Sequence, residues 1–107
     1  MKNAKMIGFG LYTPKNLVEN ERLQEFLETS DEWIRTRTGI ERRYISLDEN
    51  TSDLAVEASK KALSQARLSA EEIDLIIVAT VTPDNFTPST ACIVQDKLGA
   101  KNEWAFD

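Results

Sequence analysis

The run Leu75–Val81 constrains the fold more than any other stretch, because it is apolar without alternation. A strand with one face in water alternates apolar and polar residues, whereas a strand covered on both faces does not. We therefore expect this run to be a strand of a parallel sheet, buried on both faces. Helical patterns flank it at 52–66 and 88–98, and Trp104–Asp107 begins a further strand. This order of elements predicts an α/β fold with crossover connections.

Small residues indicate where the predicted elements approach one another closely. The helix predicted over 52–66 carries a stripe of them on one side, namely Ala55, Ala58, Ala62 and Ala66. Such a stripe lets the helix press against a sheet or another helix. Residues 4–12 are expected to form a first strand, in which Gly8 and Gly10 leave one face bare for the same kind of approach.

Capping and turn residues predict several shorter elements. Asn20 is expected to cap a helix that reaches about Leu27. Its buried stripe would consist of Leu23, Phe26 and Leu27. Residues 40–46 are expected to be extended, and the capping-box spacing of Ser69 and Glu72 predicts a single helical turn.

Composition excludes several classes of protein. The 107 residues are 41% hydrophobic and 29% charged, which is typical of one small soluble globular domain. A net charge of −5 makes bulk nucleic-acid binding unexpected. The longest uncharged apolar run, 75–83, is too short to span a bilayer, so we expect no membrane association.

The chain has no histidine and a single cysteine, Cys92. Without histidine, this chain taken alone cannot assemble a Ser-His-Asp or Cys-His mechanism, and a metal site such as a zinc site is not expected. A lone cysteine excludes an internal disulfide and fits a reducing compartment. We therefore expect a cytoplasmic protein.

The stretch Thr29–Ile40 predicts a short helix that ends at Gly39. Thr29 has the spacing of a capping box with Glu32, and Ser30 is the rival cap. Trp33 and Arg37 lie one helical turn apart and should share a face. An indole beside a guanidinium suits a ligand that has a flat ring and a phosphate.

The spacing of these residues alone is compatible with two interpretations of this helix. One is a ligand site, supported by a local excess of cationic residues, namely Arg35, Arg37, Arg42 and Arg43. The other is a partly buried Trp33 covered by its neighbouring arginine, on a solvated surface without a ligand.

The sequence of Thr29–Ile40 resembles the N-terminal fingerprint of the β-ketoacyl-acyl-carrier-protein synthase III family; it reads Thr-Ser-Asp-Glu-Trp-Ile-Arg-Thr-Arg-Thr-Gly-Ile. Residues 7–14, 41–43, 76–80 and 105–107 also look like that family, in its order and at nearly its spacing. The resemblance implies a thiolase-like fold and an acyltransferase that works as a homodimer. It implies that the enzyme takes an acyl group from coenzyme A (CoA) onto a cysteine and condenses it with malonyl-acyl carrier protein (malonyl-ACP), starting fatty-acid synthesis. Acyl-CoA is a substrate there, and no separate cofactor is expected.

The resemblance also assigns site residues. Trp33 matches the tryptophan that stacks on the CoA adenine, Arg37 matches the arginine beside it, and Thr29 matches a threonine that hydrogen-bonds near the same base. The loop before Pro88 resembles a segment that lends an aromatic side chain to the partner's acyl pocket. Here that aromatic, Phe86, is displaced by Thr87, so acyl-chain preference does not follow.

The family's catalytic Cys, His and Asn have no counterpart in residues 1–107. In the family, the sequence Ala-Phe-Asp found here at 105–107 leads into the run that holds the nucleophile. We therefore expect residues 1–107 to be an incomplete domain, the N-terminal part of the first α/β half, inactive alone. Cys92 falls inside a predicted helix at a position that the family does not use for chemistry, so no catalytic residue is expected here.

Two other functions remain open. One is a related thiolase-fold condensing enzyme that makes a secondary metabolite or a hydroxymethylglutaryl-type product. The other is a free-standing, non-catalytic module that binds CoA, a nucleotide-like ligand or a partner.

Overall fold

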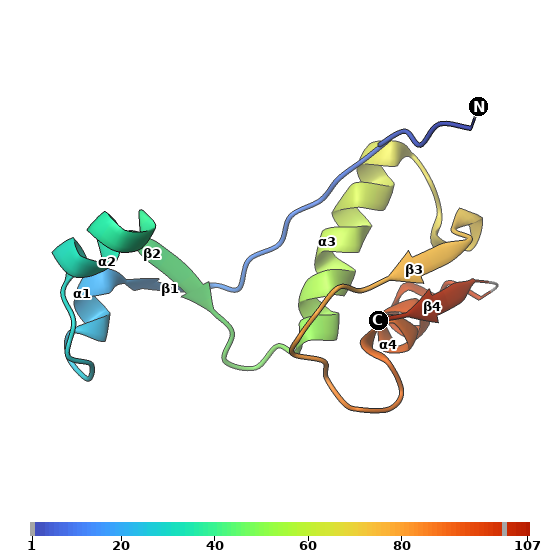
Figure 1. Ribbon diagram of the computed structural model, residues 1–107. Coiled ribbons are helices and arrows are strands. Elements are labelled where there is room, and N and C mark those ends of the chain that lie inside the picture. Colours follow the sequence, from blue (N-terminus) through green and yellow to red (C-terminus); the bar gives the residue numbers. More distant parts are fainter. Residues whose placement is uncertain (1, 102) are drawn as a thin grey trace. The chain divides into compact units, whose positions relative to one another are not determined.

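The computed structural model describes residues 2–101 and 103–107, and the chain forms two compact units. The larger unit comprises the residues up to Tyr12 together with Glu49–Asp107, and the smaller unit is Thr13–Asp48 (Figure 1). The smaller unit holds β1 (Asn16–Glu19), α1 (Asn20–Leu23), α2 (Asp31–Thr38) and β2 (Arg42–Ile45). The larger unit holds α3 (Thr51–Ala66), the 3-10 turn η1 (Ala70–Glu72), β3 (Leu75–Ile77), α4 (Thr90–Leu98) and β4 (Trp104–Phe106).

Strands β3 and β4 of the larger unit pair in parallel, with Leu75 opposite Trp104 and Ile77 opposite Phe106. Helix α4 connects the two strands and contacts both of them. It begins where Ser89 Oγ accepts a hydrogen bond from the backbone N–H of Cys92 at 3.3 Å. This strand–helix–strand arrangement confirms the predicted parallel pairing.

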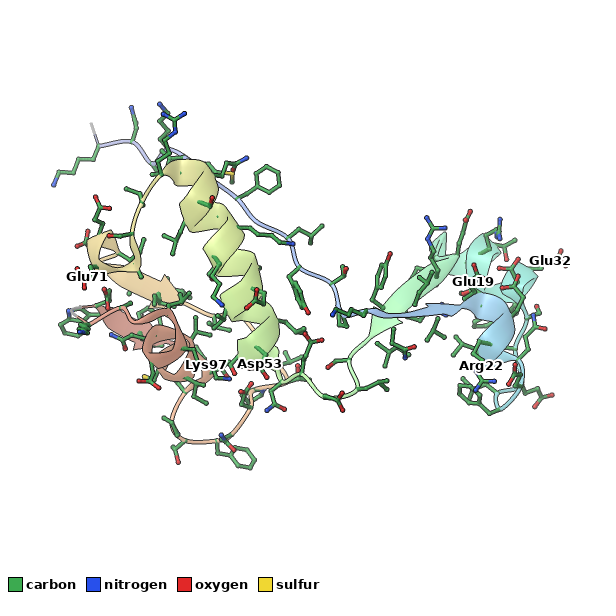
Figure 2. The ribbon with its side chains drawn as sticks, turned by 180° about the vertical axis from the view of Figure 1, so that it is seen from behind. Glu19, Arg22, Glu32, Asp53, Glu71 and Lys97 are labelled. Carbon is green, nitrogen blue, oxygen red and sulfur yellow. The ribbon has the colours of Figure 1, made fainter. Side chains whose placement is uncertain are left out.

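The core of the larger unit lies where α3 and α4 pack together. Its buried apolar side chains are Val56, Ala91, Val94 and Ala100. An ion pair joins the same two helices at their ends, with Lys97 Nζ 2.7 Å from Asp53 Oδ1 (Figure 2). Apolar burial therefore holds the pair together, and the ion pair links the start of α3 to the end of α4.

The strand predicted at residues 4–12 is not formed, although the predicted close approach of its glycines is confirmed. A Cβ atom at Gly10 would lie 2.1 Å from the carbonyl oxygen of Ala58, and one at Gly8 would lie 2.7 Å from that of Ala62. The segment packs its backbone on α3, where the N–H of Phe9 donates to Gln65 Oε1 at 2.7 Å. A strand needs a neighbouring strand, and none of the residues that the structure describes pairs with this segment.

The expectation that Leu75–Val81 is buried on both faces is also wrong for this chain. The strand ends at Ile77, and Leu75 and Ile77 are 47% and 60% exposed. Ile76 between them is half-buried, so one face of β3 is covered. The other face, which carries Leu75 and Ile77, is only partly covered within the described part of the chain.

The smaller unit is built on the antiparallel pair β1–β2, in which Asn16 lies opposite Ile45 and Glu19 opposite Arg42. Asn20 was expected to cap a helix, but α1 begins at Asn20 itself and ends at Leu23. The predicted stripe of that helix is also wrong, because Phe26 and Leu27 are 65% and 53% exposed. Asn20 does not act as a cap, because its side chain is 0% exposed and bonds to residues outside α1, Asp31 and Ile40.

No helix among the residues described is long and apolar enough to cross a membrane.

Candidate functional site

Helix α2 has well-defined ends. Ser30 is its N-cap, and Ser30 Oγ accepts a hydrogen bond from the backbone N–H of Trp33 at 3.1 Å. Gly39 ends the helix with a φ of 73°, and its N–H donates to the carbonyl oxygen of Arg35 at 2.8 Å. The predicted end is confirmed, whereas the predicted capping role of Thr29 is wrong, because the rival Ser30 fills it.

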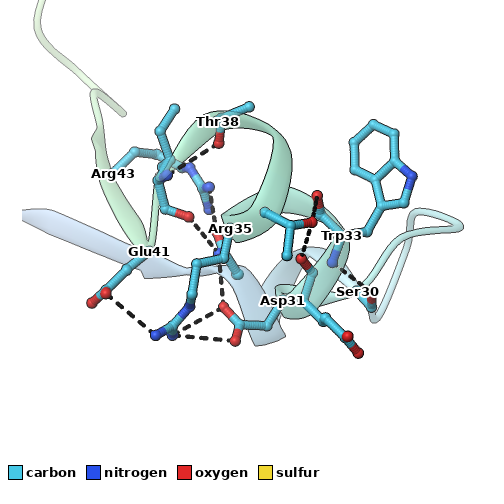
Figure 3. A network of polar contacts seen from close by, with 11 residues as sticks. Ser30, Asp31, Trp33, Arg35, Thr38, Glu41 and Arg43 are labelled. Atoms are coloured by element: carbon cyan, nitrogen blue, oxygen red, sulfur yellow. Dashed lines mark hydrogen bonds and ion pairs between the residues drawn. The ribbon is translucent and has the colours of Figure 1, made fainter.

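Trp33 and Arg37 come together on one face of α2, as their spacing predicts. The guanidinium carbon of Arg37 lies 4.7 Å from the centroid of the Trp33 ring, which is a cation–π distance. Trp33 is 53% exposed. The indole is therefore a half-exposed aromatic surface with the Arg37 guanidinium beside its ring. Figure 3 shows the Trp33 side chain directed away from the polar contacts around Arg35 and Asp31.

The arginines near this face differ in the hydrogen bonds and ion pairs that they form within the chain. Arg35 forms ion pairs with Asp31 at 3.2 Å and Glu41 at 3.3 Å (Figure 3). Arg43 donates to Asn20 Oδ1 at 2.5 Å. Arg37, by contrast, makes no hydrogen bond or ion pair with any residue that the structure describes. Its planar set of N–H donors is thus available to an anion from outside the chain.

Thr29 lies immediately before the N-cap of α2 and is half-buried. Its backbone N–H donates to the carbonyl oxygen of Leu27 at 2.9 Å. The described residues include no hydrogen bond between the Thr29 side chain and Trp33 or Arg37. Of the three predicted site residues, the structure therefore brings two into direct contact and leaves Thr29 at the entry to their helix.

Sequence reasoning missed the residue to which both ends of α2 are bonded. Asn20 Nδ2 donates to Asp31 Oδ1 at 2.8 Å and to the carbonyl oxygen of Ile40 at 2.7 Å. The hydrogen bond from Asn20, aided by Arg35, lowers the pKa of Asp31 below its usual value despite partial desolvation. No local pattern could have revealed this role, because the partners of Asn20 lie 11 and 20 residues away in the sequence.

Cys92 lies in the first turn of α4 and is half-buried. Its Sγ atom is 3.2 Å from Ser89 Oγ and 3.7 Å from the carbonyl oxygen of Ala105. The thiol is thus held between the start of α4 and β4, and our interpretation of it as structural stays a prediction.

Comparison with known proteins finds relatives that match all or nearly all of this chain. The chain is 99% identical, over all 107 residues, to the β-ketoacyl-[acyl-carrier-protein] synthase III of Clostridium perfringens strain 13. The crystal structure of 3-oxoacyl-[acyl-carrier-protein] synthase III from Aquifex aeolicus matches 96% of the chain at 53% identity, with a TM-score of 0.93. The priming β-ketosynthase of the R1128 polyketide biosynthetic pathway matches 96% at 38% identity, with a TM-score of 0.92. No protein-family profile matches the chain.

The match covers only part of each relative. The chain spans 33% of the length of the Clostridium perfringens protein, 33% of the Aquifex aeolicus chain and 31% of the polyketide ketosynthase chain.

Proposed function

We propose that this chain belongs to the β-ketoacyl-acyl-carrier-protein synthase III family and is part of an acyltransferase that condenses an acyl-CoA with malonyl-ACP. The single observation that supports this most strongly is the 99% identity to a protein of that name over every residue of the chain. Such an enzyme starts fatty-acid synthesis. The reacting Cys, His and Asn would lie outside residues 1–107, which would form the N-terminal part of the first α/β half.

The contribution of residues 1–107 would be part of the CoA entrance, formed by α2. Trp33 would stack on the adenine ring, and the proposal draws support from its 53% exposure and from the helical face that it shares with Arg37. Arg37 would meet the ring edge or a phosphate, since no described residue engages its N–H donors. Thr29 would hydrogen-bond near the same base, from its place just before the helix.

The matching experiment measures steady-state kinetics of the complete enzyme with acetyl-CoA and malonyl-ACP. Trp33→Ala should raise the KM for acetyl-CoA about 10- to 100-fold, because base–aromatic stacking contributes roughly 1–3 kcal/mol. The KM for malonyl-ACP should stay unchanged. Trp104→Phe is the control, since Trp104 is also exposed but lies on β4 of the larger unit. An unchanged KM for acetyl-CoA in the folded Trp33→Ala enzyme would refute the CoA entrance.

A second candidate is a condensing enzyme of secondary metabolism. The likeness to the priming β-ketosynthase of a polyketide pathway supports it, with a TM-score of 0.92 at 38% identity. The same assay separates the two functions, because a starter enzyme of fatty-acid synthesis turns over acetyl-CoA with malonyl-ACP. Turnover only with other acyl groups or acceptors would favour the second candidate, and CoA binding without any turnover would favour a non-catalytic module.

The proposed activity also implies a setting. The enzyme would work as a homodimer in the cytoplasm, with acyl-CoA and malonyl-ACP as its partners. Light scattering of the complete enzyme after size-exclusion chromatography checks the dimer, and a monomer mass would contradict it.

A further inference from the structure

Helix α2 carries the exposed pair Trp33 and Arg37, yet it buries no residue of its own. A helix that buries little apolar surface receives little positional restraint from packing. Its orientation must therefore depend largely on polar contacts. Those contacts gather on one residue of the smaller unit, Asn20.

The amide of Asn20 reaches both ends of α2. Nδ2 donates to Oδ1 of Asp31, the first residue of the helix, at 2.8 Å. The same nitrogen donates at 2.7 Å to the carbonyl oxygen of Ile40, which follows the C-cap Gly39. Both amide hydrogens are thus used, one at each end of the helix.

The side-chain oxygen and the backbone N–H of Asn20 bond to Arg43 on β2 and to Glu41, which directly precedes β2. Oδ1 accepts from Arg43 Nη2 at 2.5 Å, and the backbone N–H donates to the carbonyl oxygen of Glu41 at 3.2 Å. Asn20 is 0% exposed, so water cannot replace a lost partner without opening the unit.

We propose that Asn20 is a positioning residue for the Trp33–Arg37 pair, acting by hydrogen-bonding both ends of α2. The inference rests on the proposed CoA entrance. Only a side chain that donates twice and accepts once satisfies Asp31, Ile40 and Arg43 together. Aspartate has nearly the same shape but cannot donate when ionised, so it would face the carboxylate of Asp31 and the carbonyl oxygen of Ile40 as a third acceptor.

The test uses the complete enzyme with the substitution Asn20→Asp. The KM for acetyl-CoA should rise about tenfold, because the orientation of α2 is lost, while kcat and the KM for malonyl-ACP stay within about twofold. Asn16→Asp is the matched control, because it adds the same charge to β1 of the same unit and should leave all three parameters unchanged.

A double variant separates positioning from mere stability. Asn20→Asp combined with Asp31→Asn again places an amide donor opposite a carboxylate and should return the KM for acetyl-CoA at least partly to the wild-type value. A purely structural role would instead lower the melting temperature and change kcat and both KM values together.

Arg43→Lys covers the case in which Asn20→Asp does not fold. It removes the guanidinium contact to Asn20 Oδ1 but keeps the charge, and it should also raise the KM for acetyl-CoA selectively. If Trp33→Ala raises this KM while folded Asn20 and Arg43 variants leave it unchanged, the positioning role is overturned and the CoA entrance survives. If Trp33→Ala also leaves it unchanged, the CoA entrance itself fails.

Discussion

At the scale of single residues, Gly10 is the glycine at which an added methyl group would meet the shortest contacts. A Cβ atom there would lie 2.1 Å from the carbonyl oxygen of Ala58 and 2.6 Å from the backbone nitrogen of Ala62. Both are backbone atoms of α3 and cannot turn away. Gly10→Ala should therefore force residues 4–12 off the helix and lower the free energy of unfolding by about 1–3 kcal/mol, measured by urea denaturation of the protein.

Gly8→Ala gives a graded comparison for the same contact. Its Cβ atom would lie 2.7 Å from the carbonyl oxygen of Ala62, so it should destabilise the enzyme less than Gly10→Ala. Equal or opposite effects of the two substitutions would show that this backbone contact does not exist in solution.

Some residue contacts could be predicted from the sequence and others could not. Helical spacing placed Trp33 and Arg37 on one face, because the two residues belong to one element. The role of Asn20 escaped prediction, because it depends on Asp31, Ile40 and Arg43, which only the folded unit brings near. Asparagine before a helix is more often a cap. A sequence pattern cannot distinguish a cap from a buried asparagine that hydrogen-bonds several distant residues.

At the scale of elements, α2 offers a test of which residue begins it. Ser30→Ala removes the side-chain oxygen that accepts from the N–H of Trp33 and should lower the free energy of unfolding by about 0.5–2 kcal/mol. Thr29→Ala should cost less, because Thr29 is not the cap. Urea denaturation of the two variants gives the comparison, and the reverse ranking would restore Thr29 as the cap.

The contact between α3 and α4 should make stability depend on pH. The hydrogen bond from Lys97, and then that from the backbone of Asn50, lowers the pKa of Asp53 below its usual value. A lowered folded-state pKa adds stability above the usual Asp pKa, and this stability is lost as the pH falls through the folded-state pKa. Asp53→Asn should therefore lower the free energy of unfolding at pH 7, and the difference from wild type should shrink between about pH 5 and pH 2.

Urea denaturation across that pH range provides the measurement. Asp74→Asn is the control, because it removes the same charge but breaks no ion pair among the residues described. Added salt should reduce the effect of Asp53→Asn, since both partners of the ion pair are more than one-third exposed. A difference that persists unchanged at low pH would contradict the ion-pair explanation.

The two longest helices were predicted more accurately than the strands, for a physical reason. The ends of α3 and α4 fall within two residues of the predicted ones, because capping residues act within one turn. The capping box of η1 is also confirmed, with the Ser69 N–H 2.8 Å from Glu72 Oε2. The strand expected at 4–12 is absent. A strand forms only beside another strand, and the sequence of the segment itself does not show whether one is present.

At the scale of the whole molecule, the predicted α/β class and the thiolase-like fold are confirmed. The parallel pair β3–β4 with α4 between its strands is the observed form of the pattern, and the likeness to the Aquifex aeolicus synthase III extends over 96% of the chain. Periodicity gave the class, whereas the particular fold followed from the resemblance at Thr29–Ile40 and elsewhere. Burial was overestimated, because Leu75 and Ile77 are only partly covered by the described residues.

The segment that packs its glycines on α3 turns its large side chains the other way. Ile7, Phe9 and Leu11 are 60%, 67% and 70% exposed. Wherever nothing covers those three side chains, they are available to other apolar surfaces, so this stretch is expected to promote aggregation.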